Sequence, residues 1–275
     1  MGLLRSIKKT FAPSGPAAAG APAEGGWEEV CRASGLRPID PLRTSDIIIA
    51  GYPKSGNTWM QYLIAGAFYG LDLTIVPDAL VQDLVPDVHF KKVIKHYYPV
   101  TFFKSHFLPR PDYRNVIYLL RDGRDAMVSY WHYLQALTDQ PIDFLDMVRS
   151  GTGLFPCKWH THVEQGLANP CGARMMTVRY EDLKEDTARE LRRIGEFAGL
   201  ACETAVLEQA ARKGSFSPMK AREASFAWEN PQIPKNKPFV RRGRVGSHLE
   251  EMPSTVRQAF VEEAREVLKK TGYLE

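Results

Sequence analysis

The sequence is poor in cysteine and has no long uninterrupted apolar run. Its 275 residues include only four cysteines, which form no C-x-x-C pair and no regular framework. Such usage argues against a disulfide-stapled secreted domain and favours a reducing, cytoplasmic compartment. No apolar run reaches the roughly 20 residues that a membrane helix needs, and the N-terminus lacks the apolar core of a secretory signal. We therefore expect a soluble chain without disulfides.

The sequence also lacks a strong excess of either charge. A net charge of +4 suits a small polyanionic ligand but is too weak to indicate a nucleic-acid partner. The 44% hydrophobic and 25% charged composition is that of an ordinary globular protein, long enough for one sizeable core. We predict one main domain and no nucleic-acid partner.

The first part of the chain differs in composition from the rest. Residues 12–26, APSGPAAAGAPAEGG, bury too little apolar surface to offset the entropy lost on ordering. Residues 1–11, MGLLRSIKKTF, combine an apolar helical face with basic residues and match the acylation pattern M-G-x-x-x-[ST]. Weak peripheral membrane contact is one interpretation, and a disordered basic leader is the favoured one. We divide the chain into a flexible tail and linker at 1–26 and a folded domain at 27–275.

Strand-like apolar runs alternate with helical patterns along the domain. Strands are expected at 46–52, 101–106, 115–121 and 174–180, and helices at 57–69, 123–137, 185–198, 203–212 and 254–270. Near-continuous apolar strands separated by helices predict the α/β class, with a parallel central sheet flanked by helices. The segment 215–246 is rich in Pro, Lys, Arg and Asn and has little periodicity, so we expect a long functional loop there.

The stretch IIIAGYPKSGNTW resembles a phosphate-binding loop without its lysine. Gly51, Gly56 and Thr58 stand where G-x-x-x-x-G-K-[ST] requires them, but Asn57 replaces the lysine and Lys54 lies earlier in the loop. Backbone N–H groups and a helix N-terminus would still make an anion site, to which Lys54 adds a charge. The missing lysine, and the lack of a clear apolar strand ending in a magnesium-binding Asp, weigh against an ATP- or GTP-dependent phosphotransferase.

Two basic segments follow later in the chain. Arg121 closes a predicted strand, and Ser129 lies about two helical turns further on. A guanidinium suits phosphate oxygens, and the alternative is that Arg121 and Asp122 form a structural ion pair or a helix cap. The run FVRRGRVG at 239–246 is a flexible basic segment whose function depends on what lies beside it.

The run FFKSHF carries a candidate proton acceptor. Strand alternation places Lys104 and His106 on the same side of the sheet, with Ser105 opposite. A histidine can act as a general base near neutral pH, and a neighbouring lysine can stabilise developing negative charge. Because α/β folds bind ligands at the carboxyl edge of the sheet, we favour a catalytic pair over packed polar residues.

In this order, these elements resemble the PAPS-dependent sulfotransferase superfamily of the soluble, cytosolic type. The match includes YPKSGNTW, KSH, RDGRDAMVSYWHY, VRYEDLKED, SF at 215–216 and RRGRVG. The resemblance implies a single domain like a P-loop nucleotide kinase. Such a domain binds 3′-phosphoadenosine 5′-phosphosulfate (PAPS) without a metal, transfers its sulfuryl group to a hydroxyl or amine, and releases PAP.

The resemblance also implies roles for individual residues. For the 5′-phosphosulfate it assigns Lys54, Ser55, Gly56, Asn57, Thr58 and Trp59, and for the 3′-phosphate Arg121, Ser129, Arg241, Arg242 and Gly243. Near the adenosine it assigns Tyr180, Ser215 and Phe216, with Trp59 against the ring. His106 would be the catalytic base, Lys104 would stabilise the transition state, and Lys54 would stabilise the bridging oxygen as its bond to sulfur breaks. A module that binds PAP without turnover is the alternative, and the presence of both Lys54 and His106 argues against it.

Several positions depart from the animal enzymes of the family. Ser247 and His248 stand where those enzymes have aspartate and tryptophan, and nucleotide binding is expected to survive this change. Phe260 replaces the glutamate of their dimerisation motif, so dimerisation by that route is not expected and the oligomeric state stays open. The run CKWHTH at 157–162 has metal-binding residue types, but no fourth ligand is evident and a zinc site is disfavoured.

The acceptor is the open part of the prediction. Segments 70–100, 140–158 and 222–240 are expected to build its pocket, with aromatic residues beside several charges. Aromatic walls suit a phenol, a steroid or a lipid alcohol, while a sugar or an amine stays open as an acceptor.

Overall fold

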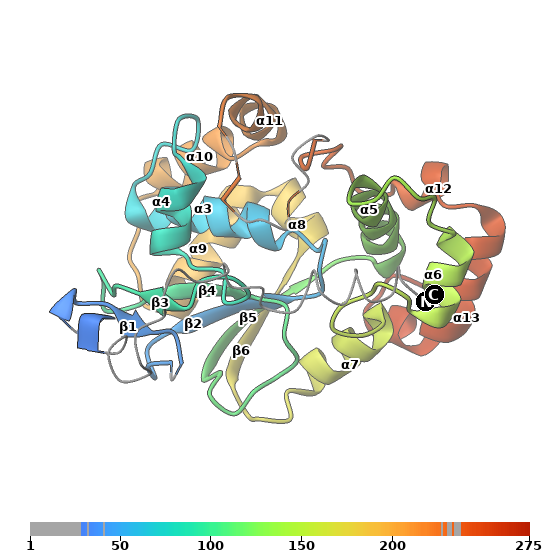
Figure 1. Ribbon diagram of the computed structural model, residues 1–275, viewed down its shortest axis with the longest axis horizontal. Coiled ribbons are helices and arrows are strands. Elements are labelled where there is room, and N and C mark those ends of the chain that lie inside the picture. Colours follow the sequence, from blue (N-terminus) through green and yellow to red (C-terminus); the bar gives the residue numbers. More distant parts are fainter. Residues whose placement is uncertain (1–28, 32, 41, 227, 230–232, 234–237) are drawn as a thin grey trace.

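A four-stranded parallel sheet in the order β4-β2-β5-β6 lies at the centre of the computed structural model (Figure 1). The strands are β2 (Ile47–Gly51), β4 (Phe102–Ser105), β5 (Asn115–Leu120) and β6 (Arg174–Arg179). The structure describes residues 29–275 except 32, 41, 227, 230–232 and 234–237. The predicted tail at 1–26 and its membrane contact lie outside the described residues.

The sheet is buried on both faces, which is why its strands are almost continuously apolar. In β2, Ile47 and Ile49 belong to the core cluster on one face, and Ile48 and Ala50 belong to the cluster on the other. Neighbouring strands run parallel and in register across the sheet. Parallel sheets are covered by helices in this way because each crossover connection places a helix on a face.

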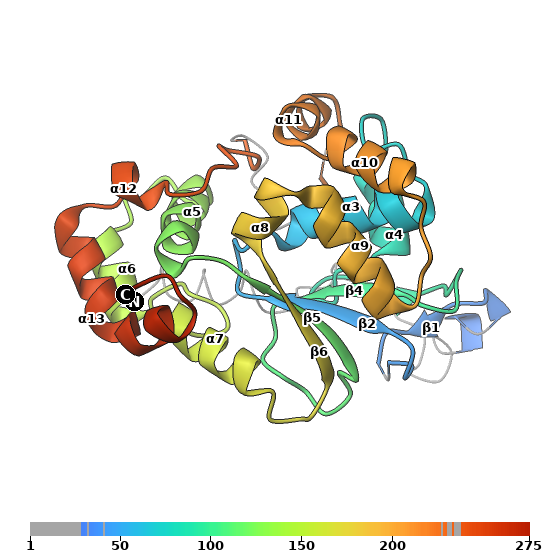
Figure 2. The same ribbon diagram turned by 180° about the vertical axis from the view of Figure 1, so that it is seen from behind.

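The helices divide between the two faces (Figures 1 and 2). One core cluster takes side chains from α3 (Asn57–Tyr69), α4 (Asp78–Leu84), α8 (Tyr180–Glu185), α9 (Thr187–Ala198), α10 (Thr204–Lys213) and α11 (Phe216–Ser225). The other takes them from α5 (Gly123–Ala136), α6 (Phe144–Ser150), α7 (Trp159–Ala168) and α13 (Ser254–Lys270), with the short α12 (His248–Glu251) beside α5. A small antiparallel pair, β1 (Arg37–Pro38) and β3 (Val93–Ile94), lies apart from the main sheet. The predicted α/β class is confirmed. In the described part of the chain, no helix is long and apolar enough to cross a membrane.

The prediction of one long loop over 215–246 is wrong for its first part. Helix α11 occupies Phe216–Ser225, where Met219 and Arg222 are buried three residues apart on one face. Pro218 lies in the first turn, where its missing N–H breaks no helical hydrogen bond. Helix α11 is therefore stabilised by packing that its polar sequence does not reveal.

Candidate active site

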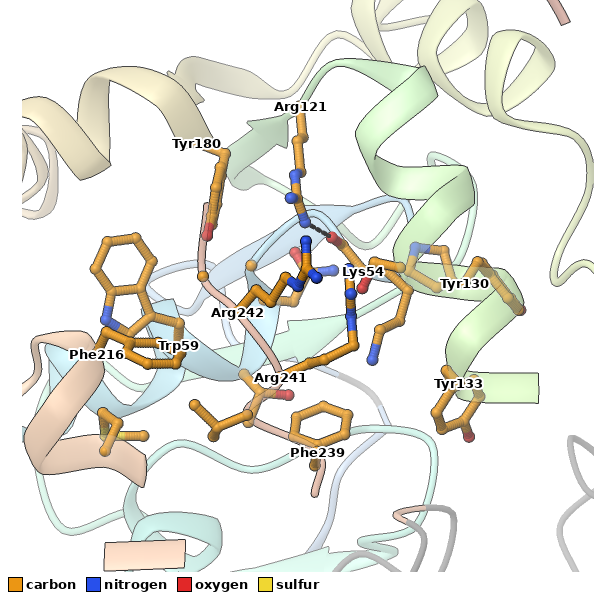
Figure 3. A pocket seen from close by; sticks show the side chains of 18 of the residues that line it. Lys54, Trp59, Arg121, Tyr130, Tyr133, Tyr180, Phe216, Phe239, Arg241 and Arg242 are labelled. Carbon is orange, nitrogen blue, oxygen red and sulfur yellow. Dashed lines mark hydrogen bonds between the residues drawn. The ribbon is translucent and has the colours of Figure 1, made fainter. Parts of the chain in front are cut away.

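A cavity of about 200 Å³ lies at the carboxyl ends of β2, β4 and β5 (Figure 3). It collects side chains from the loop after β2, the end of β4, the end of β5, helix α5, helix α11 and the segment around 239–247. Carboxyl ends of parallel strands meet at one edge, and this edge is where open α/β sheets bind ligands. The fold thus brings together elements far apart in the sequence.

The loop after β2 turns sharply into the N-terminus of α3. Gly56 has φ +100°, and a Cβ added there would stand 2.8 Å from Tyr180 Cδ2, so only glycine fits. Lys54 also adopts a left-handed conformation, with φ +71°, which costs a lysine conformational energy. The turn directs the first backbone N–H groups of α3 and the Lys54 side chain toward the cavity, as an anion site requires.

Lys54 extends between aromatic rings near other cations. Its Nζ lies 4.0 Å from the ring centroid of Phe239 and 4.6 Å from that of Tyr133. Burial, together with repulsion from Lys104, Arg121 and Arg241, lowers the pKa of Lys54 to about 7. An anion bound among these groups would offset the repulsion and raise that pKa.

Arg121 connects the anion loop with the basic segment. Its Nη1 donates to the Lys54 carbonyl at 2.8 Å, and its Nη2 donates to the Arg244 carbonyl at 3.2 Å. Its guanidinium also lies 4.2 Å from the ring centroid of Tyr180 (Figure 3). Asp122, which we considered as its ion-pair partner or as a helix cap, pairs instead with Arg124 at 2.6 Å. It does cap α5, because its Oδ1 accepts from Arg124 N at 2.9 Å.

The basic segment is held in place by acidic residues. Arg241 Nη1 donates to Glu251 Oε2 at 2.6 Å, and Arg242 Nη1 donates to Glu251 Oε1 at 3.2 Å. The chain turns directly after these arginines, at Gly243, which has φ +59°. A Cβ added to Gly243 would stand 2.7 Å from Phe216 Cδ2. The arginines therefore reach the cavity from a backbone that packs closely against its aromatic wall.

Asp125 of α5 anchors the end of the same segment. Its carboxylate accepts hydrogen bonds from Gly246 N at 2.7 Å, from His248 N at 2.9 Å and from His248 Nδ1 at 2.8 Å. Burial acts to raise the pKa of Asp125, but these bonds and the nearby Arg121 outweigh it, and the pKa lies below its ordinary value. His248, which differs from the residue of the animal enzymes, thus helps to hold this segment against α5.

Glu223 of α11 forms hydrogen bonds with the aromatic segment that lines the cavity. Its carboxylate accepts from Trp228 Nε1 at 2.9 Å, from Phe239 N at 2.7 Å and from Val240 N at 3.0 Å. The rings of Trp228 and Phe239 lie 5.4 Å apart, and both line the cavity. One carboxylate therefore sets the position of this wall.

His106 has one ring nitrogen engaged with backbone. Its Nδ1 lies 2.8 Å from the Gly51 carbonyl, which can only accept, so Nδ1 carries the hydrogen and Nε2 keeps a lone pair. Asn57 Nδ2, 2.9 Å from the same nitrogen, directs its own hydrogens to the carbonyls of Gly51 and Tyr52. Burial, then the charge of Lys104, holds the pKa of His106 well below its usual 6.5. The imidazole is neutral at pH 7, the form in which Nε2 can accept a proton.

Lys104 lies on the same side of the sheet end as His106, as the strand alternation predicted. Its Nζ forms a buried ion pair with Asp87 Oδ2 at 2.8 Å, and both side chains line the cavity with His106. Ser105 points to the opposite face, where its hydroxyl lies 2.9 Å from that of Tyr113.

The predicted adenosine residues form an aromatic corner. Trp59 and Tyr180 meet edge to face with ring centroids 5.7 Å apart, and Phe216 lies on the same side of the cavity (Figure 3). Trp59 is fixed by a 2.7 Å hydrogen bond from Nε1 to the Gly214 carbonyl. Three aromatic rings gathered at one side of the cavity suit a planar heterocycle.

Of the sixteen site residues assigned from the sequence, fourteen line the cavity and two do not. The cavity is lined by Lys54, Gly56, Asn57, Thr58, Trp59, Lys104, His106, Arg121, Ser129, Tyr180, Phe216, Arg241, Arg242 and Gly243. Ser55 is buried in the loop and Ser215 is exposed with its hydroxyl on the Arg212 carbonyl, so neither side chain is among the lining residues.

The sequence interpretation did not identify Asp87, His89 or Glu223. Asp87 and His89 lie in the segment assigned to the acceptor pocket, and their alternate spacing matches that of Lys104 and His106. That alternate spacing could have indicated that both side chains lie on one side of an extended segment. It does not reveal which strand this segment pairs with.

His162, considered for zinc, is part of the support of the site. Its Nδ1 lies 2.9 Å from the Tyr118 hydroxyl, and its Nε2 donates to the His106 carbonyl at 3.2 Å. Within the described ranges, no group of three or more metal-binding side chains comes together.

Comparison with known proteins gives the family. A model of the sulfotransferase domain matches residues 44–272. Sulfotransferase 1E1 of Mus musculus is 24% identical over 250 residues, covering 82% of this chain and 84% of that protein. Cytosolic sulfotransferase 1 of Danio rerio is 27% identical over 258 residues, with the same two coverages of 82% and 84%.

Two solved structures share the fold. Mouse sulfotransferase SULT7A1 complexed with PAP has a TM-score of 0.62 at 21% identity, covering 84% of this chain and 86% of that one. Retinol dehydratase in complex with androsterone and inactive cofactor PAP has a TM-score of 0.62 at 19% identity, covering 97% and 94%. The expected P-loop-like architecture is confirmed. Because the family model spans most of its length, the chain belongs to the sulfotransferase domain family.

Proposed function

We propose that the chain transfers the sulfuryl group of PAPS to a hydroxyl or amine of a small acceptor. One observation carries the proposal: a neutral His106 and the basic side chains of Lys54, Lys104 and Arg121 line the same cavity. The cations suit a polyanionic donor, and a neutral imidazole beside them suits proton removal from an acceptor.

The donor fits the cavity from two sides. The loop at 54–59 would hold the 5′-phosphosulfate, while Arg121, Ser129 and the segment at 241–243 would hold the 3′-phosphate. Trp59, Tyr180 and Phe216 would enclose the adenine. The structures of SULT7A1 and retinol dehydratase both contain PAP, which supports this nucleotide for the present chain. Cationic side chains supply the positive charge that a metal supplies in kinases, so we propose donor binding without a metal.

The reaction follows from the position of each group. The acceptor oxygen attacks sulfur in line while His106 Nε2 takes its proton. The bond between sulfur and the bridging oxygen breaks, and its electron pair stays on that oxygen as the leaving 5′-phosphate. Lys54 would stabilise the charge on the bridging oxygen, and Lys104 would stabilise the transferring group.

The acceptor end favours an apolar alcohol or a phenol. Its walls are formed by Tyr133, Trp228, Ile233, Phe239 and Met219. Hydrophobic and aromatic linings with few polar groups select ligands by shape and apolar area. Solved structures of retinol dehydratase contain androsterone and retinol, which supports acceptors of this kind.

The name of the Danio rerio relative, cytosolic sulfotransferase 1, supports a cytoplasmic location for this chain.

Calorimetric titration with PAP and with ADP, which lacks the 3′-phosphate, tests the donor. We expect PAP to bind at least about a hundredfold more tightly than ADP. The 3′-phosphate adds several hydrogen bonds between charged groups, and each such bond contributes about 1.5–3 kcal/mol. Equal affinity for the two nucleotides would reject the 3′-phosphate clamp.

Substitution of the base tests the chemistry. His106→Ala should abolish transfer from labelled PAPS and leave the Kd for PAP within about twofold. His160→Ala, on the partly exposed side of α7, is the matched control and should keep full activity. Transfer by the His106 variant at the wild-type rate would remove His106 from the mechanism.

A further inference from the structure

We propose that Asp87 is a positioning residue for sulfuryl transfer, which fixes the ammonium of Lys104 at the reacting end of the cavity. The inference rests on the proposed function and extends it to a residue outside the motifs that indicated the family. It starts from the contacts between the segment 86–89 and the end of β4.

The segment 86–89 is joined to β4 by its backbone. Lys104 N donates to the Pro86 carbonyl at 2.8 Å, and Val88 N donates to the Lys104 carbonyl at 3.1 Å. These bonds form a parallel bridge between Asp87 and Lys104. Directly paired positions carry their side chains on the same face, so the backbone alone brings this carboxylate beside this ammonium.

The side chains complete the contact in a buried place. Lys104 Nζ lies 2.8 Å from Asp87 Oδ2, and the two side chains are 6% and 2% exposed. Asp87 Oδ1 also accepts from His89 N at 3.0 Å, which fixes the orientation of the carboxylate. Burial acts to raise the pKa of Asp87, but the charge of Lys104 outweighs it and the pKa lies below its ordinary value. Asp87 is therefore ionised at neutral pH.

Lys104 needs such a partner because its surroundings are cationic. Lys54, Arg121 and Arg241 line the same cavity, and repulsion between Lys54 and Lys104 contributes to the lowered pKa of Lys54. A lysine carries a point charge on a flexible stem, so nothing in its own geometry holds it. Asp87 holds the ammonium against this repulsion, and a misplacement of about 1 Å at such a site can cost about a hundredfold in rate.

The same segment also supports the proposed base. His106 N donates to His89 Nε2 at 2.8 Å, and the two imidazole rings stack with centroids 5.3 Å apart. Asp87 and His89 are thus matched with Lys104 and His106 along two adjoining backbones. This arrangement makes the segment 86–89 a fixed support for both reacting groups.

Asp87→Asn tests the inference, because the amide has the same shape without the charge. With an acceptor that the wild-type enzyme sulfates, kcat should fall about tenfold to a hundredfold, while the Kd for PAP stays within about twofold. Asp87→Glu keeps the charge and should restore part of kcat. Asp83→Asn is the matched control: its carboxylate pairs with Lys91 at 2.6 Å on the surface and is 51% exposed, and kcat should not change.

A double-mutant cycle separates positioning from a general structural role. In a Lys104→Met background, Asp87→Asn should cost less than about threefold in kcat, because its target is gone. Thermal unfolding and PAP affinity, measured on every variant, show whether each one folds. Equal losses of kcat in the wild-type and Lys104→Met backgrounds, or a wild-type kcat for Asp87→Asn, would overturn this inference and leave the proposed function unaffected. A wild-type chain that transfers to no acceptor would overturn the proposed function and this inference together.

Discussion

Binding of PAP should draw a proton onto Lys54. In the free chain, burial and neighbouring cations lower the pKa of this lysine to about 7. A phosphate held by the same loop would favour the ammonium and raise the pKa toward its ordinary range. At pH 8 about a tenth of the free chain would carry this proton, so binding should take up about 0.9 proton for each PAP.

The sign of the pH dependence follows from the same shift. Only the protonated lysine attracts the anion, and raising the pH through 7 removes that proton from the free chain. The Kd for PAP should therefore increase about fivefold between pH 7 and pH 8, and about ninefold more by pH 9.

Calorimetry at pH 8 in two buffers with different ionisation enthalpies measures the proton uptake directly. The 3′-phosphate, with a second pKa of about 6, is already ionised there. His106 is already neutral, because its pKa lies well below 6.5. Lys54→Met should lose most of the uptake and the pH dependence of Kd. The same uptake in the wild-type and Lys54→Met chains would refute the assignment.

Three further substitutions separate folding from the site. Gly166→Ala would place a Cβ 2.3 Å from Tyr118 Cε2. Urea denaturation should therefore show a free energy of unfolding lowered by about 1–3 kcal/mol, with no change in PAP affinity. An unchanged free energy of unfolding would contradict this packing. Asp125→Asn weakens the anchor to His248, and calorimetry should show a Kd for PAP raised about tenfold; an unchanged Kd would mean that the anchor is dispensable. Glu223→Gln loosens the aromatic wall, and steady-state kinetics should show the acceptor KM raised more than the Kd for PAP; equal changes would argue against that role.

Elements with strong local signals were predicted closely. The helices expected at 57–69 and 254–270 have these same bounds as α3 and α13. Glycines flank the largely apolar α3 at both ends, and apolar periodicity marks α13. Helix α11 was missed because its buried positions include Arg222, a residue type that patterns assign to the surface. Periodicity detects a helix only when its buried side is apolar.

The site could be predicted where its residues follow strand ends. His106 and Arg121 come directly after strands of the parallel sheet, and Lys54 lies in the loop after another, so the fold class already places them at one edge. Asp87 could not be placed in this way, since its partner lies 17 residues away and joins it through a single isolated bridge. Such a pairing depends on how two loops pack, which no local pattern records.

The two hydrogen bonds of Arg121 have a consequence for how the chain matures. They join residues 67 and 123 positions apart, and contacts of such long separation form late in folding. A chain growing on the ribosome would present its anion loop long before Arg241 and Arg244 are synthesised. Nascent chains stalled before residue 241 should therefore not retain PAP, and nucleotide capture would mark the completion of the domain.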